Sequence, residues 1–167
     1  MTYEKVRAYF ESVGLDNRIT VRDEVSDTAE NSARVIGCEI GQIAKTLSFL
    51  LEGEPILVLM SGEAKVDNRK YKLCFGQKPT MISHDRVKEL TGYIPGAVSP
   101  YLLKDGVHVY LDVSLQRYDI LYTAAGSLTS TIKLTRDELI EHSKSCGWVD
   151  VCKGWQDFSE SALSPEF

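Results

Sequence analysis

The sequence lacks the features that mark membrane and secreted proteins. No apolar run approaches the roughly 20 residues that a membrane-spanning helix requires. The first residues do not show the charged-then-apolar pattern of a secretory signal. We therefore expect a cytoplasmic protein with no membrane partner. No internal repeat and no linker rich in glycine, serine or proline divides the 167 residues, so we expect a single domain over residues 1–167.

Clustered metal ligands and activated nucleophiles are also missing. The four cysteines form no Cys-x-x-Cys pair, and the three histidines are scattered along the chain. Zinc sites usually show closely spaced ligands, so we expect no metal, no cofactor and reduced thiols. No Gly-x-Ser-x-Gly elbow surrounds any serine, and no cysteine has an evident activating neighbour, which disfavours covalent catalysis.

Positive charge is in deficit as well. The chain has 19 Lys and Arg residues against 24 Asp and Glu residues, which gives a net charge of −5. Proteins that grip long nucleic acids through their phosphates are usually basic, so this balance argues against such a partner. It still permits the binding of a short nucleic-acid end at a local basic patch.

Hydrophobic residues make up 43% of the chain, which is enough for a sizeable core. Apolar periodicity and capping residues, with Asp27 or Thr28 as the second cap, predict helices over residues 3–13, 28–36, 68–75, 83–90 and 135–143. Apolar and alternating runs predict strands over residues 18–21, 44–51, 56–60, 79–82, 107–112, 120–124 and 130–134. We expect a hairpin turn at residues 53–55 and a loosely held tail over residues 159–167. Strands joined by turns predict an α+β fold with a mixed, largely antiparallel, barrel-like sheet surrounded by helices.

Lys45 interrupts one of the most apolar strands of the chain. Its neighbours include Ile43, Leu47 and Phe49. A lysine is rarely buried without a partner, because desolvating its charge costs several kcal/mol. Lys45 therefore lies at a strand end facing a cleft, pairs with a carboxylate, or reaches solvent from a strand edge.

The segment Gly92–Pro100 is a loop that cannot form regular structure, because it contains two glycines and two prolines. Such a loop can present backbone N–H and C=O groups to a ligand in a fixed geometry. It lacks the glycine pattern of a phosphate-binding loop. A structural turn without a ligand is the alternative interpretation.

Two carboxylates and one turn are further candidates. Asp67 and Asp112 each lie next to the end of a strand or helix, where a carboxylate can orient a water or bind an amine. Each can instead cap a helix. The small residues of Ala124–Ser127 permit the close approach of a ligand or of another backbone.

Six segments occur in an order that is similar to one known family. They are Gln42-Ile-Ala-Lys-Thr-Leu, Pro55-Ile-Leu-Val-Leu-Met with the following Ser-Gly, Lys65-Val-Asp67, Thr91-Gly-Tyr with Gly96-Ala-Val-Ser-Pro100, Val109-Tyr-Leu-Asp112-Val-Ser-Leu and Tyr122-Thr-Ala-Ala-Gly126. Together they resemble the YbaK/prolyl-tRNA synthetase associated domain family, whose members remove wrongly attached amino acids from tRNA. The resemblance covers a family core of about residues 28–139.

This resemblance implies a function and a site. The function is hydrolysis of mischarged aminoacyl-tRNA by a freestanding trans-editing factor, with a small amino acid such as alanine or cysteine, typically on the tRNA for proline. The partner is the tRNA 3′ end, and an aminoacyl-tRNA synthetase is a second candidate partner. Lys45 would hold the 3′-terminal adenosine at the mouth of the pocket. The implied loop that positions the ester consists of Gly96, Ala97, Val98, Ser99 and Pro100.

Backbone N–H groups of that loop are suitable donors to the oxyanion of a tetrahedral intermediate, so no nucleophilic side chain is required. The expected substrate-binding residues are Asp67, Asp112, Gly126 and Ser127. A non-catalytic module that binds an amino acid, an aminoacyl-adenosine or a protein is the alternative. It is motivated by the acidic balance and by the absence of a basic residue after Gly126, where many relatives carry one. A general thioesterase has little support in these motifs.

Overall fold

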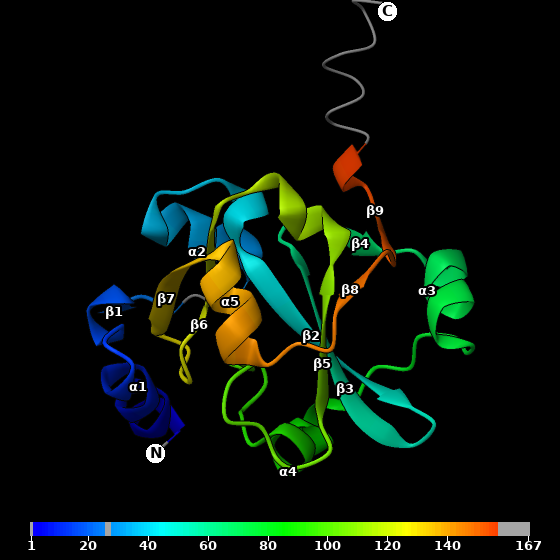
Figure 1. Cartoon of the computed structure of the whole chain (residues 1–167), viewed down its shortest axis with the longest axis horizontal. Helices are drawn as coiled ribbons and strands as arrows, with labels where there is room; N and C mark the ends of the chain where they lie inside the picture. Colours follow the sequence, from blue (N-terminus) through cyan, green and yellow to red (C-terminus); the bar gives the residue numbers. More distant parts are fainter. Residues whose placement is uncertain (1, 26–27, 157–167) are drawn as a thin grey trace, which may run out of the picture.

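Helices and strands are mixed along the chain without a regular repeat in the computed structural model, which describes residues 2–25 and 28–156 (Figure 1). The helices are α1 (Thr2–Ser12), α2 (Ala29–Ile36), α3 (Asn68–Phe75), α4 (Val87–Thr91) and α5 (Arg136–Ser143). The strands are β1 (Ile19–Val21), β2 (Ala44–Leu51), β3 (Glu54–Ser61), β4 (Lys65–Val66), β5 (His108–Asp112), β6 (Ile120–Ala124), β7 (Ser130–Thr135), β8 (Trp148–Val149) and β9 (Cys152–Lys153). Short 3₁₀ helices are η1 (Asp16–Arg18), η2 (Ile40–Gln42), η3 (His84–Arg86) and η4 (Val113–Arg117).

Two sheets form the centre of the molecule and meet at one edge. The first has the order β1-β7-β6 and is antiparallel. The second has the order β2-β3-β5-β8, with β2 antiparallel to β3 and the remaining pairs parallel. A parallel bridge between Ile43 and Tyr122 joins the two sheets. The result is a curved, barrel-like arrangement that does not close within the described residues, and it confirms the predicted α+β class.

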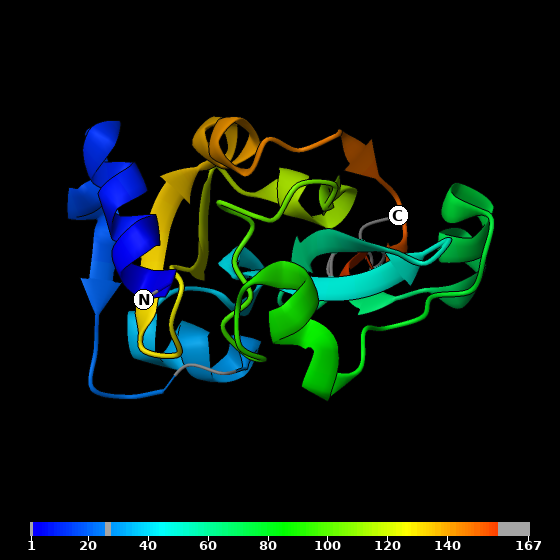
Figure 2. The ribbon, with the colours of Figure 1, turned by 90° about the horizontal axis from the view of Figure 1, so that it is seen from below.

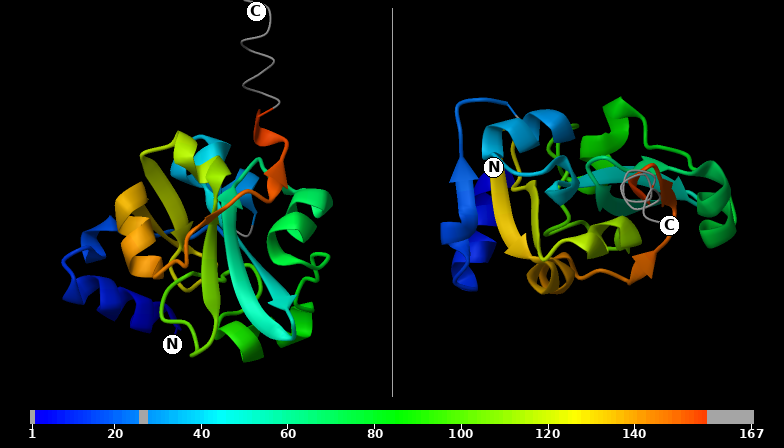
Figure 3. Two further views of the ribbon diagram at one scale, coloured as in Figure 1. Left: turned by 45° about the vertical axis from the view of Figure 1, so that its right-hand side comes forward. Right: turned by 90° about the horizontal axis from the view of Figure 1, so that it is seen from above.

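Helices surround this arrangement. Helices α1 and α3 lie at opposite ends of the molecule (Figures 1 and 2). Helices α2 and α5 lie on opposite sides of the β6–β7 pair (Figure 3). None of the helices in the described ranges has both the length and the apolar character needed to span a bilayer.

Strand β3 is buried on both faces and divides the interior into two cores. Leu57 and Leu59 are fully buried in the larger core, together with Phe10 of α1. Val58 and Met60 point the other way into the second core, beneath α3. Successive side chains of a strand alternate between faces, and each such burial contributes roughly 1.5–3 kcal/mol. The central strand therefore provides a rigid base for its neighbours β2 and β5.

The helix boundaries follow local capping chemistry. Thr28 caps α2 by accepting a hydrogen bond from the N–H of Asn31, and Asp67 caps α3 in the same way. Thr135 and Glu138 form the predicted capping box of α5. These predictions are confirmed.

The alternative cap Asp27 and the predicted tail over residues 159–167 both lie outside the described ranges.

The hairpin turn lies one residue earlier than predicted. Glu52 and Gly53 form the turn, with φ of 52° and 83°. Positive φ at both central residues matches the twist of the flanking strands. Pro55 is consequently not in the turn but in β3, opposite Leu50.

The prediction of a regular strand over residues 79–82 is wrong, because this segment does not pair with a neighbour over several residues. It forms one isolated bridge, between Met81 and Phe49. Pro79 has no N–H to donate, and proline disfavours regular pairing within a sheet. Two backbone hydrogen bonds make this bridge: the N–H of Leu50 donates to Thr80 O at 2.8 Å, and the N–H of Ile82 donates to Ser48 O at 3.1 Å.

The chain after α5 returns along the second sheet. Strand β8 pairs with β5, and β9 pairs with β4. The sequence did not predict these three two-residue strands, β4, β8 and β9, because they depend on partners far along the chain. The described part of this segment therefore completes the sheet and its second core.

Candidate active site

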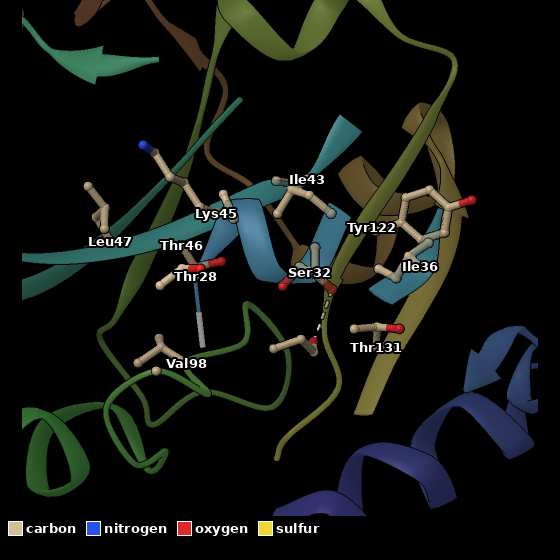
Figure 4. Close-up of a pocket in the computed structure, with 15 residues that line it drawn as sticks. Thr28, Ser32, Ile36, Ile43, Lys45, Thr46, Leu47, Val98, Tyr122 and Thr131 are labelled. Atoms are coloured by element: carbon tan, nitrogen blue, oxygen red, sulfur yellow. Dashed lines mark hydrogen bonds between the residues drawn. The ribbon is translucent and has the colours of Figure 1, made fainter. Parts of the chain in front are cut away.

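A cavity of about 260 Å³ lies where the two sheets meet (Figure 4). Strand β2 and the residue before it contribute residues 43–47, and β6 contributes residues 122–124. The Gly/Pro loop contributes Gly96 and Val98. Lys45 and the loop, which are far apart in sequence, thus border one hollow.

Hydroxyl groups from several elements complete the lining. Thr28 belongs to the cap of α2, Thr46 to β2, Thr123 to β6 and Thr131 to β7. Sequence analysis did not single them out as site residues. Scattered threonines carry no pattern that could have identified them, because only the folded chain brings them together.

Lys45 is the second residue of β2 and is half-buried at the edge of the cavity. Its Nζ donates a hydrogen bond to Gly62 O at 3.3 Å. Burial is the main cause that lowers the pKa of Lys45, although its environment also includes the charge of Glu30, which opposes the shift. Figure 4 shows its amine turned outward from the cavity, on the opposite side from Tyr122. Because β2 is an edge strand of its sheet and the amine points away from the cavity, two interpretations fit this position: a strand end beside a cleft, and a lysine that reaches solvent from a strand edge.

The carboxylate next to the Gly62 carbonyl is already engaged. Glu63 Oε1 lies 2.6 Å from Nη2 of Arg117. Arg117 also donates to Ser61 Oγ at 2.8 Å. Within the described part of the chain no ion pair to Lys45 is found. The ammonium group is therefore free of a carboxylate that would compete with an anionic or polar ligand.

The loop is held in a fixed shape by its own backbone and by one serine. Gly96 has a φ of 87°, a conformation that suits glycine. The N–H of Ala97 donates to Ile94 O at 3.0 Å. Buried Ser99 donates from Oγ to Ala97 O at 3.1 Å and accepts from the N–H of Gly126 at 3.0 Å. Ser99 is thus a tether of the loop.

Two buried tyrosines brace the ends of the loop. The Tyr93 hydroxyl donates to Tyr101 O, and the Tyr101 hydroxyl shares a hydrogen bond of 2.8 Å with Thr123 Oγ1. Burial raises the pKa of both phenols, so they remain protonated at neutral pH. The bracing connects the loop to β6, which lines the same cavity. Its only sequence signal is the pair of aromatic residues flanking the loop.

The predicted substrate-binding residues lie elsewhere. Asp67 accepts from the N–H of Lys70 at 3.0 Å as the cap of α3. Ser127 Oγ lies 2.6 Å from Ser130 Oγ, and the N–H of Gly126 donates to Ser99 Oγ of the loop. Neither these residues nor Asp112 are among those that line the cavity.

Asp112 is fully buried and has a structural position. It accepts hydrogen bonds from the N–H of Ser114 at 2.9 Å and from the N–H of Val151 at 2.8 Å. It thereby caps η4 and attaches the returning C-terminal segment.

Asp112→Asn is expected to lower the free energy of unfolding by roughly 1.5–3 kcal/mol, the value of a charge-assisted buried hydrogen bond. The amide can accept with only one of its two terminal atoms, so one backbone N–H is left without its acceptor. Urea unfolding measures the change. Asp67→Asn is the control, because Asp67 is only partly buried, whereas Asp112 is fully buried, and its loss is expected to be smaller. Equal losses in the two variants would contradict the structural position of Asp112.

All four cysteines are free thiols. The described ranges contain no group of three His, Cys, Asp or Glu side chains that could hold a metal ion.

Known proteins are similar to this chain in sequence and in fold. The family model for the aminoacyl-tRNA editing domain matches residues 23–142. The uncharacterized protein YwhH of Bacillus subtilis (strain 168) is 43% identical over 157 residues, which cover 93% of this chain and 100% of that protein. Proline--tRNA ligase of Staphylococcus aureus (strain Newman) is 30% identical over 99 residues, which cover 59% of this chain and 17% of the ligase. A solved structure of a proposed trans-editing enzyme for prolyl tRNA synthetase has a TM-score of 0.81 and 27% identity, covering 92% of this chain and 98% of that one.

Proposed function

The chain belongs to the aminoacyl-tRNA editing domain family, and on this premise we propose that it is a freestanding deacylase of mischarged aminoacyl-tRNA. The observation that supports the proposal most directly is the shared cavity of Lys45 and the loop residues Gly96 and Val98. A cation that forms no ion pair with the described carboxylates can bind the polar groups of a nucleoside, and a rigid loop of backbone amides can bind the oxyanion formed from its ester.

The terminal adenosine binds at the rim of the cavity, and the Lys45 ammonium donates to its polar groups. The aminoacyl group enters the cavity between β2 and the loop. Gly96 and Val98 line the cavity, so their N–H groups are the candidate donors to the ester, whereas that of Ala97 is already bonded to Ile94 O. Donors that meet the developing oxyanion are worth roughly 2.7–4 kcal/mol each.

The nucleophile is a water molecule. Its oxygen forms a bond to the ester carbonyl carbon, and the bond from that carbon to the ribose oxygen then breaks. One water proton is transferred to the ribose oxygen, which yields a free tRNA hydroxyl and a free amino acid. Ser99 is the only serine of the loop, and its hydroxyl is committed to Ala97 O and Gly126 N. This commitment supports a mechanism without a covalent intermediate.

The proposed substrate carries a small amino acid, alanine or cysteine, on the tRNA for proline. Ile43, Leu47 and Val98 give the cavity an apolar lining. A hydrophobic pocket discriminates by roughly 1–3 kcal/mol per methylene, so it disfavours larger side chains without excluding them sharply. The similarity to part of a proline–tRNA ligase supports this choice of tRNA and a synthetase as partner.

The test is hydrolysis of charged tRNA. Proline-specific tRNA bearing alanine, cysteine, serine or proline is incubated with the protein, and loss of the ester is followed over time. We expect alanyl- or cysteinyl-tRNA to be deacylated at least about 10-fold faster than prolyl-tRNA, in line with the discrimination of one or two methylenes. No acceleration over spontaneous hydrolysis with any substrate would remove the proposal.

A binding module without catalysis is the second candidate, and the net charge of −5 favours it. Calorimetry with a non-hydrolysable alanylamido-adenosine separates the two functions. Binding of this analogue together with intact charged tRNA after incubation would identify the module rather than the enzyme.

A further inference from the structure

A second hollow, of about 340 Å³, adjoins the cavity. The two share three lining residues, Ile36, Tyr122 and Thr131. Figure 4 shows these residues on the opposite side of the cavity from Lys45. A ligand that is longer than the cavity can therefore extend across these shared residues into the second hollow.

The second hollow is built on the outward face of the β1-β7-β6 sheet. Strand pairing places Thr20 opposite Thr131, and Lys133 opposite Tyr122. Because side chains alternate along a strand, these residues share one face. The other face carries Ile132 and its apolar neighbours of the larger core.

Three cations line this face, and we name Arg18, Arg22 and Lys133 the basic basin. Among the residues that the structure describes, no carboxylate lines the hollow. Arg18 is paired with Glu138 at 2.9 Å. Arg22 donates to Thr131 Oγ1 at 3.1 Å, and Lys133 is exposed. Positive charge therefore exceeds negative charge locally, on a chain whose net charge is −5.

Such a concentration of cations beside a nucleoside-ester cavity suits the phosphates of a nucleic-acid strand. Phosphodiesters supply the negative charge that arginine and lysine bind. The ring of Tyr122 belongs to both hollows, so a base passing between them can stack on it.

We infer that the basic basin binds the phosphodiesters of the single-stranded nucleotides that precede the terminal adenosine of the tRNA. The inference rests on the proposed function and assigns the strand a direction. The ester lies in the cavity, and the adenosine crosses the mouth of the cavity from Lys45 so that its 5′ phosphate lies on the Tyr122 side. The preceding nucleotides pass from there toward Arg22 and Lys133. Because the basic basin binds these phosphates, the protein binds the end of an RNA more tightly than it binds a free aminoacyl-nucleoside.

The experiment compares two probes by fluorescence anisotropy or calorimetry. One is a short RNA that ends in CCA and carries a non-hydrolysable 3′-alanylamide. The other is the alanylamido-adenosine without phosphates. The variant R22A/K133A removes two charges from the basin. The matched control R69A/K72A removes two exposed charges from α3, at the other end of the molecule (Figure 1).

R22A/K133A is expected to weaken binding of the RNA probe at least 10-fold near 100 mM salt and binding of the nucleoside less than twofold. The slope of log K against log salt should fall by about 1.4, because each single-strand phosphate contact contributes about 0.7. The control is expected to change either affinity less than twofold. K133A alone, which leaves the bond from Arg22 to Thr131 intact, should show half of the slope change.

Several results would overturn the inference. If R22A/K133A and the control lose equal affinity for the RNA probe, the binding depends on the overall charge of the protein and not on a site at the basic basin. Equal losses on both probes would indicate damage to the cavity. If the unaltered protein binds both probes equally well, the basin is refuted while the proposed function stands. If it binds neither probe, the proposed function itself fails.

Discussion

Lys45→Ala is expected to lower kcat/KM for deacylation at least about 100-fold while the protein remains folded. Two lost hydrogen bonds from a charged donor, each worth roughly 1.5–3 kcal/mol, account for a loss of this size. The assay is initial-rate hydrolysis of alanyl-tRNA, together with circular dichroism of the folded protein. An active Lys45→Ala enzyme would contradict the role assigned to this lysine.

The large loss of activity in Lys45→Ala should not be accompanied by a comparably large fall in its thermal midpoint. Burial lowers the pKa of Lys45 from 10.5, so the folded state disfavours its charged form. The unfolded state then binds more protons between the lowered pKa and 10.5, and stability rises with pH in that window. Removing the amine removes this penalty. Lys65→Ala is the control, because Lys65 is an exposed lysine of β4 that does not line the cavity, and it should retain activity.

The fold was predictable where local chemistry decides it. The bounds of β2 follow from an apolar run, and the start of α2 follows from Thr28. Strands β4, β8 and β9 were missed because each consists of two residues whose pairing depends on a distant segment. The segment 79–82 was predicted as a strand because its composition is extended, but Pro79 limits its pairing to one bridge.

The site was predictable where a residue type conflicts with its surroundings. Lys45 stands out because it is a charge in an apolar strand, and the loop around Gly96 stands out by composition. Asp112 shows the limit of this reasoning. A carboxylate after a strand has the same sequence pattern whether it binds a substrate or caps a buried turn, and burial distinguishes the two. The basic basin was not predictable, since Arg22 and Lys133 meet only through the pairing of β1 with β7.

Gly96→Ala tests whether the shape of the loop, rather than its presence, supports catalysis. The φ of Gly96 is 87°, and that of Gly106 is 90°. An L-residue at either position is strained by roughly 1–3 kcal/mol, so both alanine variants should lose similar stability in urea unfolding. Gly106 does not line the cavity, and a Cβ there meets no atom within 4 Å. Gly106→Ala is therefore a matched control for backbone strain.

Only Gly96→Ala is expected to lower kcat, by about 10- to 100-fold. Relief of the strain moves the N–H groups of Gly96 and Val98 relative to the ester, and a displacement of about 1 Å at a reacting centre can cost 100-fold in rate. KM should change little, because the variant keeps Lys45, to which the proposed function assigns the binding of the adenosine. If both variants lose activity in proportion to their stability, the loop is only a structural turn. If neither loses activity, the oxyanion donors are not the amides of this loop, and hydrolysis must draw on the threonine hydroxyls of the cavity instead.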